Sequence, residues 1–475
     1  MEVKQTIVAD GDFKLMKKKV TCLIIMILSV WSMPVQAQYS TTFLHTDSIK
    51  IQRSAKKNYW RPAVEIIGLN TGIWAFDRYV LNEDWARISA SSIKRNMKQK
   101  FIWDNDMFAT NLFAHPYHGG LYFNAARSNG LSFWQSVPLT FGGSYMWELI
   151  FEKQPPSLND IIATPIGGVA MGEITHRFSR LFLDDSKRGW ERLGREFVAG
   201  IISPVDLLNR ILSGKAWKYH SPDNDGYTDL SPLFQIRFSV ANRFMSDLYE
   251  NKSIFNMSIS AETVYGEIFT GEPHSPYDYF KSEINANPLG KQPLLSDVSI
   301  IGLIWGREWN RNGANWMAGI FQHFDYYDSN PVVEGSKRPY EFAETASFGG
   351  GLIYANQRNN RLSNFKGELF ANLVLLGASE SDYCVLDKRN YNLGNGYSFK
   401  FNGMFSFGKK FDIAFGFKHY HIFTSIGYGS VEAEMNGLPE DSEIDYANVQ
   451  GNKGRALLDK IHIDTGFQLS KRIRI

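Results

Sequence analysis

Residues 111–180 read NLFAHPYHGGLYFNAARSNGLSFWQSVPLTFGGSYMWELIFEKQPPSLNDIIATPIGGVAMGEITHRFSR and contain two apolar helical runs whose few ionisable groups lie mostly at the ends. From Leu131 to Phe151 the only charge is Glu148. A run of about 20 apolar residues is long enough to span a bilayer. This stretch predicts closely packed helices around which the rest of the chain is arranged.

The second of these runs has a clear predicted start. After Pro155-Pro156, Ser157 is expected to accept hydrogen bonds from the first-turn amides while Asp160 reaches back, a capping-box pattern. The helix predicted from it is short, IIATPIGGVAMG, and its Gly168 and Gly172 form a small-xxx-small face suited to close helix packing. The glycines expected at helix contacts are Gly142, Gly143, Gly167, Gly168 and Gly172.

Outward from this stretch, the N-terminus carries a targeting pattern. Residues 1–15 look unrelated to the rest of the chain, and residues 16–37 combine three lysines, an apolar segment and a small-residue cleavage site, which predicts a secretory signal peptide. Residues 38–60 are polar and predict a flexible linker. The mature chain is therefore expected to be exported and to begin near Gln38.

Composition narrows the class of protein. The net charge is +2, with 51 basic and 49 acidic residues, so there is no basic excess to hold nucleic acid. Of the two cysteines, Cys22 falls in the predicted signal, and Cys384 alone permits no internal disulfide or cysteine-based metal cluster. Aromatic residues make up 14% and glycines number 40, which together with alternating segments points to a β-barrel with aromatic girdles.

The period of the sequence changes along the chain. Residues 61–220 predict a helical domain, whereas residues 221–475 contain about nine alternating runs separated by turn signals. Because bacterial barrels usually have even strand numbers, we expect an antiparallel outer-membrane-type barrel of about 8 to 12 strands, with one strand hidden before Leu294. The class is α+β. A soluble β-sandwich with a helical domain is the alternative.

The motifs of the helical domain resemble an uncharacterised domain-of-unknown-function family of exported, outer-membrane-type proteins of Gram-negative bacteria. The residues that carry the resemblance are Asn111, His115-Pro116-Tyr117-His118-Gly119, Ala126-Arg127 with Gly130, Trp147-Glu148, Pro156-Ser157 with Asn159-Asp160, Thr164 and Gly167-Gly168. The resemblance covers roughly Pro62 to Leu212 and implies an envelope location without a known activity. A weaker similarity, to small VanZ-like helical membrane proteins, covers only the hairpin around residues 148–168.

Ionisable residues in these apolar helices are candidates for a site, because charges in such surroundings are costly. The candidate polar cluster comprises His115, His118, Arg127, Glu148, Glu152, Asn159, Asp160, Glu173 and His176. Glu173 and His176 form a single E-x-x-H pair, whereas a two-metal carboxylate site needs two. A mononuclear site made from His115, His118, Glu148 and His176 is an alternative. A structural network, with Glu173 paired to Arg177, is the favoured interpretation, and we expect neither metal nor cofactor.

The sequence thus favours an outer-membrane barrel whose helical domain plugs it, docks beneath it or packs within it. The expected role is non-enzymatic, in transport or envelope structure, with outer-membrane lipid and the barrel assembly machinery as partners. Two alternatives remain open: an envelope-modifying enzyme that uses His115, His118, Glu148 and Glu173, and a soluble periplasmic binding protein.

Overall fold

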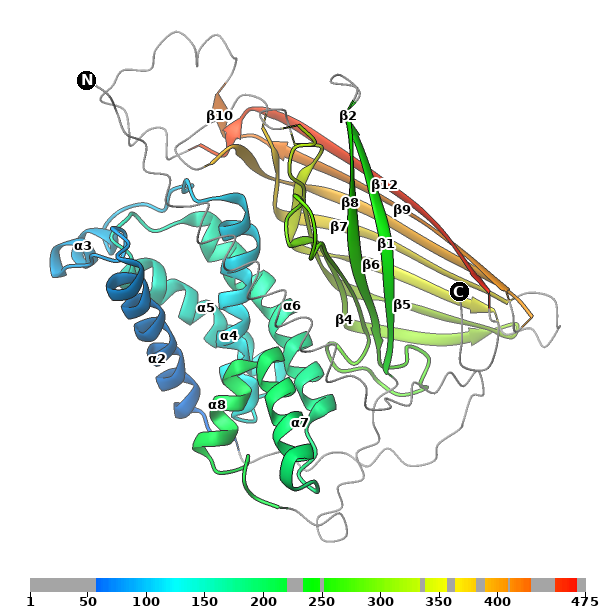
Figure 1. The fold of residues 1–475 in the computed structure, drawn as a ribbon, viewed down its shortest axis with the longest axis horizontal. Coiled ribbons are helices and arrows are strands. Elements are labelled where there is room, and N and C mark those ends of the chain that lie inside the picture. The colour runs from blue at the N-terminus through cyan, green and yellow to red at the C-terminus, as the bar shows by residue number, and fades with distance from the viewer. Residues whose placement is uncertain are drawn as a thin grey trace.

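The computed structural model describes residues 57–219, 234–247, 252–333, 338–356, 364–381, 389–408, 411–428 and 449–467. The predicted N-terminal extension, the predicted signal peptide and Cys384 lie outside these residues. The described chain has a helical part followed by a curled antiparallel sheet, an α+β arrangement (Figure 1).

Within residues 57–219 the helical part contains seven α-helices interrupted by three π-helical turns. The α-helices are α2 (Trp60–Phe76), α3 (Ala90–Asn96), α4 (His115–Ser128), α5 (Phe133–Met146), α6 (Leu158–Phe182), α7 (Gly189–Ile202) and α8 (Pro204–Leu212). The π turns are η1 (Asp77–Leu81), η2 (Thr110–Ala114) and η3 (Trp147–Phe151). Side-chain caps set some starts: Ser132 and Gln135 form a reciprocal capping box at α5.

One prediction about these helices is wrong. The short helix expected after Ser157 is α6, which is 25 residues long and continues through Pro165 and past Gly172. Its C-terminal half carries Glu173 and His176, whose side chains have buried partners. The apolar run of residues 131–151 forms α5 and η3, and no helix among the described residues is long and apolar enough to cross a membrane.

The sheet is a ten-stranded half-barrel in which neighbours in sequence are also neighbours in space, with β12 next to β9. Its strands are β1 (Phe234–Asp247), β2 (Lys252–Tyr265), β3 (Phe280–Ala286), β4 (Leu295–Arg311), β5 (Ala314–Asp328), β6 (Glu341–Asn356), β7 (Asn364–Glu380), β8 (Tyr391–Phe407), β9 (Phe411–Thr424) and β12 (Gly454–Phe467). The strand expected before Leu294 is β3. Within the described ranges no ladder joins β1 to β12. A short parallel pair, β10 (Gly427–Tyr428) and β11 (Gly451–Asn452), lies apart.

The curl gives the sheet an inner, concave face and an outer, convex face. Lys400 of β8 contacts Asp325 of β5, and Lys418 of β9 lies 3.5 Å from the same carboxylate. Side chains on strands three or four positions apart can meet only across the concave side. Residues that alternate with Asp325 along β5 therefore belong to the outer face.

The helices pack on the outer face. Gln322 donates from Nε2 to the Ile166 carbonyl of α6 at 2.7 Å, and Tyr326 contacts the ring of Phe108 with 5.3 Å between centroids. The helical part is therefore neither a plug nor an insert in the concave side, in contrast to two of the expected arrangements (Figure 1). Helical and strand residues share one core cluster, which includes Phe123, Ile174, Phe280, Phe324 and Leu393.

Glycines bring α4 and α6 into backbone contact. A Cβ on Gly119 would lie 1.8 Å from the Thr164 carbonyl oxygen, and one on Gly168 would lie 2.5 Å from the carbonyl carbon of Gly119. Gly172 meets Phe123, and Gly167 meets Pro116. This close crossing holds α4 and α6 in a fixed relation.

The crossing of α5 depends on one glycine of its pair. Gly143 faces the ring of Tyr122, where an added Cβ would lie 2.7 Å from Cδ2. A Cβ added to Gly142 would have no heavy atom within 4 Å, so this glycine does not lie at a helix contact as expected.

Candidate functional site

A cluster of carboxyl groups and one histidine lies where the first residues of α4 and α6 meet η3. We call it the carboxylate cluster; it consists of Asp104, Asp106, His115, Glu148, Glu152 and Asp160. Four of these residues belong to the predicted candidates, and the two aspartates come from the segment before η2. Glu148 and Asp160 are each only 1% exposed, so solvent reaches them only after local opening.

Two aspartates at the centre of the cluster share a hydrogen bond. Burial raises the pKa of Asp160, and the charge of Asp104 raises it further, so Asp160 holds a proton. Burial also opposes ionisation of Asp104, but the hydrogen bond from Asp160, the positive charge of His115 and two asparagine amides bring its pKa below the usual range. Asn111 donates to Asp104 Oδ1 at 2.5 Å and Asn159 donates to the same oxygen at 3.1 Å. The pair is therefore one proton-sharing unit.

His115 is the cation of the cluster. Its Nε2 lies 3.8 Å from Asp160 Oδ2 and 3.9 Å from Asp106 Oδ2. Burial lowers the pKa of His115, but contact with Asp106 and the charges of Glu152, Asp106 and Glu148 outweigh it and raise the pKa to about 9. An imidazolium thus offsets part of the carboxylate charge at neutral pH.

Burial raises the pKa of both glutamates of the cluster, but to different extents. Burial, followed by the charges of Glu152 and Asp160, raises the pKa of Glu148 well above its ordinary value. Burial also raises the pKa of Glu152, to about 7, although the charge of His115 opposes the shift. Glu152 accepts from the Trp147 indole at 2.5 Å. The cluster therefore changes its proton content near neutral pH.

Glu148 has a structural contact that was expected of Asp160. Ser157 accepts the Asp160 N–H at 3.3 Å, as a helix cap does, but the Ser157 N–H donates to Glu148 Oε2 at 2.7 Å. The predicted reciprocal cap by Asp160 is therefore wrong, because its carboxyl group is held by Asn159 and Asp104 instead. Glu148 connects η3 to the start of α6.

The sheet closes the cluster from the other side. Tyr391 of β8 accepts from Asn111 Nδ2 at 2.7 Å and donates to the Asp106 carbonyl at 2.9 Å. Arg389 donates to the Asp104 carbonyl at 2.6 Å and is itself fully buried. These contacts were not predicted, because nothing local in the sequence marks residues that lie about 280 positions away as partners.

His118 lies outside the carboxylate cluster, although it follows His115 by only three residues in α4. Its Nε2 is 2.9 Å from the Tyr122 hydroxyl, which also contacts Asn70, and its ring meets that of Trp147 edge to face. Burial, followed by the charge of His115, lowers the pKa of His118 to about 3, so its imidazole is neutral. His118 belongs to an aromatic contact between α2, α4 and η3.

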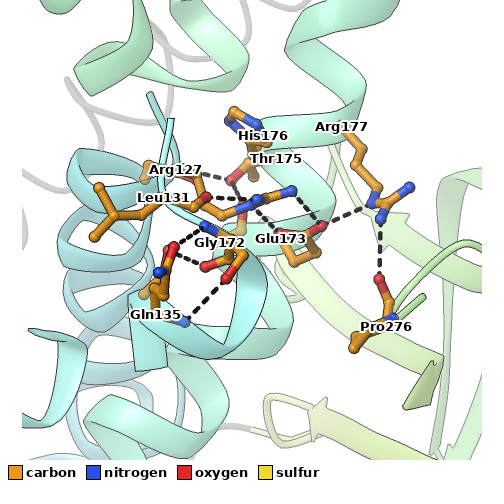
Figure 2. A network of polar contacts seen from close by, with 12 residues as sticks. Arg127, Leu131, Gln135, Gly172, Glu173, Thr175, His176, Arg177 and Pro276 are labelled. Atoms are coloured by element: carbon orange, nitrogen blue, oxygen red, sulfur yellow. Dashed lines mark hydrogen bonds and ion pairs between the residues drawn. The ribbon is translucent and has the colours of Figure 1, made fainter. Parts of the chain in front are cut away.

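A second buried network lies in the C-terminal half of α6, around Glu173 (Figure 2). Arg127 holds the carboxylate with Nε at 2.8 Å from Oε2 and Nη2 at 3.1 Å from Oε1, and Arg177 Nε lies 2.8 Å from Oε1. Arg177 also donates to the Pro276 carbonyl at 2.9 Å and contacts Asp278. We call this the arginine clamp; it joins α4 and α6 to the segment that leads into β3.

The clamp matches its charges. Burial alone would raise the pKa of Glu173, but the charges of Arg177 and Arg127 bring it below its ordinary value. Glu173 and Arg177 lie one turn apart, the pairing that the structural interpretation of the sequence expected. Glu173 is therefore an ionised structural anchor.

The E-x-x-H pair does not form one site. His176 Nδ1 lies 3.0 Å from Asp206 Oδ2 of α8, and Ser179 donates to the same oxygen at 3.1 Å. The set His115, His118, Glu148 and His176 is thus divided among separate contacts. In the described part of the chain, no group of three or more His, Cys, Asp or Glu side chains is arranged to hold a metal ion.

A third buried network, on the inner face of the sheet, was missed by the sequence analysis. Lys400 is 1% exposed and contacts Asp325 and, at 2.8 Å, Glu344; Lys418 donates to the Ser299 hydroxyl at 3.0 Å. Single charged residues at alternate positions of otherwise apolar strands are the signal that would have indicated it.

Among known protein families, one family model matches part of the helical region. The family model described as Domain of unknown function (DUF3943) matches residues 100–205. No curated protein matches the chain, and no solved structure matches it. The matched segment is shorter than the expected resemblance from Pro62 to Leu212, and it contains the whole carboxylate cluster together with Arg127, Glu173 and Arg177 of the arginine clamp. The likeness to a family of unknown function therefore lies in the segment that holds both networks of the helical part.

Proposed function

We propose that this chain is an outer-membrane β-barrel protein with a non-enzymatic, structural role in the cell envelope, whose helical part is held against the outer wall of the barrel. The observation that carries the proposal is the polarity of the sheet. Lys400, Asp325 and Glu344 are buried on the inner face, whereas apolar side chains of the outer face are exposed. A sheet in water has the opposite preference, since exposure of apolar area costs free energy.

Exposed apolar side chains occupy the outer face where the helices do not cover it. Ile461 is 73% exposed, Leu373 69% and Trp305 59%. Others on the same face are Ile320, Leu352, Leu369, Phe399, Phe417 and Ile463. An apolar surface shared by so many strands is of the kind that lipid covers.

A row of aromatic rings supports a membrane boundary at one end of the sheet. It runs across β4 to β9, next to residues 312–313 and Gly408, and consists of Trp309, Trp316, Tyr354, Phe365, Phe405, Phe407 and Phe411. Trp309 and Trp316 are directly paired and stack with 6.3 Å between centroids. Transmembrane barrels carry such girdles at the level of the lipid headgroups.

The filled inner face favours a structural role over an open passage. Phe321 and Phe370 meet edge to face with 5.1 Å between centroids, and Tyr420 and Tyr327 join hydroxyl to hydroxyl at 2.9 Å. All four side chains are buried. The residue set of the enzymatic alternative is divided, because Glu173 lies in the arginine clamp and His118 contacts Tyr122, whereas His115 and Glu148 belong to the carboxylate cluster.

The proposal is tested by fractionating cells that make the full chain and by comparing heated with unheated samples on a gel. We expect the protein in the outer-membrane fraction, with migration that changes on heating. Release with soluble periplasmic contents, without a change in migration, would contradict the proposal and favour the soluble alternative.

A matched pair of substitutions sharpens the test. Ile461→Lys places a charge on the proposed lipid-facing surface, where it costs about 2 to 4 kcal/mol, and should lower the folded, heat-modifiable fraction. Met97→Lys is the control, because Met97 is 60% exposed on the helical part and away from the sheet. Equal yields of the two variants would argue against lipid at Ile461.

A further inference from the structure

The helical hairpin α7–α8 has an ionic inner side. Arg210 lies 2.6 Å from Glu196 Oε1 and also contacts Asp185, while Arg192 lies 3.2 Å from Asp185 and donates to the Lys215 and Lys218 carbonyls. Arg192 and Glu196 are buried. The charges that a helix in water would expose are here turned inward and paired.

The outer side of the same hairpin is apolar. Trp190 is 86% exposed, and Trp217, just after α8, is 70% exposed. Between them the exposed large apolar side chains are Leu193, Phe197, Leu208, Ile211 and Leu212. Leu193 and Phe197 are four residues apart and so share one face of α7. Both helices of the hairpin therefore expose apolar side chains, with a tryptophan near each end of the segment, and we call this set the apolar strip.

The border of this strip is basic. Residues 180–218 contain eight Lys or Arg and five Asp or Glu. Three of the five acids, Asp185, Glu196 and Asp206, are held in inward ion pairs. Arg188 lies 3.7 Å above the Tyr219 ring, and Lys215 and Lys218 follow α8. The charge left at the surface is positive.

We propose that α7–α8 is an interfacial hairpin that lies on an anionic lipid surface. Its apolar strip enters the boundary between headgroups and acyl chains, its tryptophans lie at headgroup level, and its basic border binds anionic headgroups. The basic border selects this occupant over an apolar protein surface, which offers no negative charge to these side chains. The inference rests on the helical part alone and holds whether or not the sheet spans a membrane.

The test uses the full chain with Cys22→Ser and Cys384→Ser and a single new cysteine, Phe197→Cys, labelled with an environment-sensitive fluorophore. The labelled protein is mixed with or reconstituted into vesicles of phosphatidylcholine, with or without phosphatidylglycerol, that carry quenchers on their acyl chains. We expect a blue shift and strong quenching in the anionic vesicles. Ser91→Cys on α3 is the matched control, because it is exposed on a polar helix surface and should show neither change.

The charged border gives a second readout. Replacing Lys215 and Lys218 with Gln should shift docking of the labelled hairpin toward water, each by roughly five-fold, since a basic residue near an anionic surface contributes about 1 kcal/mol. A label at residue 197 that stays in water in both kinds of vesicle would overturn the inference, as would equal quenching with and without phosphatidylglycerol. Quenching between labelled copies in place of lipid quenching would show that a second copy covers the strip, and would also overturn it.

Vesicle flotation separates this inference from the proposed function. A chain that floats in high salt while its label stays in water has an inserted sheet and no lipid-bound hairpin, which contradicts the inference alone. A chain that floats only at low salt, with its label quenched, has a lipid-bound hairpin and no inserted sheet, which supports the inference and contradicts the barrel.

Discussion

The carboxylate cluster at the start of α6 and the arginine clamp in its C-terminal half both contain buried carboxyl groups, yet they stabilise them differently. In the clamp, two arginines surround one carboxylate, and Glu173 stays ionised. In the cluster, His115 is the one cation among five carboxyl groups, and protons take the place of missing cations. The clamp is therefore stabilised by the pairing of opposite charges, whereas the cluster is stabilised by protonation of its carboxyl groups.

The largest effect is expected from Glu173→Ala. Without the carboxylate, Arg127 loses its counter-charge and Arg177 retains Asp278 as its acidic partner, and because both guanidinium groups are largely shielded from solvent we expect a loss of about 3 to 5 kcal/mol. Urea unfolding of the purified full chain, followed by circular dichroism, measures the loss. Arg195→Ala is a control, because Arg195 forms a half-exposed pair with Glu191 and should change stability by less than about 1 kcal/mol. Equal losses for the two variants would show that the clamp does not anchor the fold.

The pH dependence of stability should separate the two networks. The pKa of His115 is raised from 6.5 to about 9, so the folded state holds this proton more tightly than the unfolded chain does. Its contribution is complete below pH 6.5 and is lost as the pH rises to about 9, by at most about 3 kcal/mol. The pKa of Glu152 is raised from 4.5 to about 7, so this residue also lowers the free energy of unfolding as the pH rises, but over a lower range that ends at about pH 7.

Unfolding measured from about pH 6 to pH 9 checks this window. His115→Gln should flatten the fall above pH 6.5. His118→Gln should leave the pH dependence of stability unchanged, because the pKa of His118 is lowered to about 3 and its ring is neutral from pH 6 to pH 9. The clamp should contribute no slope there, since Glu173 stays ionised. An unchanged slope in His115→Gln would contradict the assignment of the proton to His115.

The glycine crossing sets the relation between the two networks, and Gly119→Ala tests it. The added methyl would lie 1.8 Å from the Thr164 carbonyl, so α4 and α6 must separate. Overpacking of this kind costs about 1 to 3 kcal/mol. Gly142→Ala is the matched control, with nothing within 4 Å, and is expected to stabilise α5 slightly. Thermal unfolding of the two variants should therefore move in opposite directions.

The smallest effect is expected from Asp160→Asn. Asp160 acts as a protonated donor to Asp104, and an amide N–H can donate in its place, so the free energy of unfolding should change by less than about 1 kcal/mol. Glu173→Gln, an equally conservative change, should cost clearly more because Arg127 and Arg177 both lose the charge of the carboxylate between them. Similar losses in urea unfolding would remove the distinction between the networks.

The sequence predicted the architecture better than the contacts. Alternation in long strands and helical spacing before residue 220 are local signals, so the α+β order and the strand range were predictable. Strand β3 was expected only because bacterial barrels usually have an even number of strands. It has seven residues, and Lys281 and Glu283 make its sequence resemble a polar loop.

The candidate site was predictable only in part, for a similar reason. His115, Glu148, Glu152 and Asp160 stood out as charges in apolar helices. Their partners Asp104, Arg389 and Tyr391 did not, since burial of a loop aspartate or of an arginine far along the chain depends on the docking of helices on the sheet. The inner-face network was likewise invisible until curvature brought β5, β8 and β9 together.

The core shared by helices and strands has a consequence for the order of assembly. Phe123 and Ile174 are synthesised early, but they pack in the same cluster as Phe280, Phe324 and Leu393, which come a hundred residues or more later. The hydrogen bond from Asn111 to Tyr391 joins residues 280 positions apart, so it can form only after still more of the chain has been synthesised. Such non-local contacts slow folding and prolong the interval in which apolar surface is uncovered. The first half of the chain therefore needs the second half to finish folding, and a chaperone that shields the helices until the strands arrive would raise the yield.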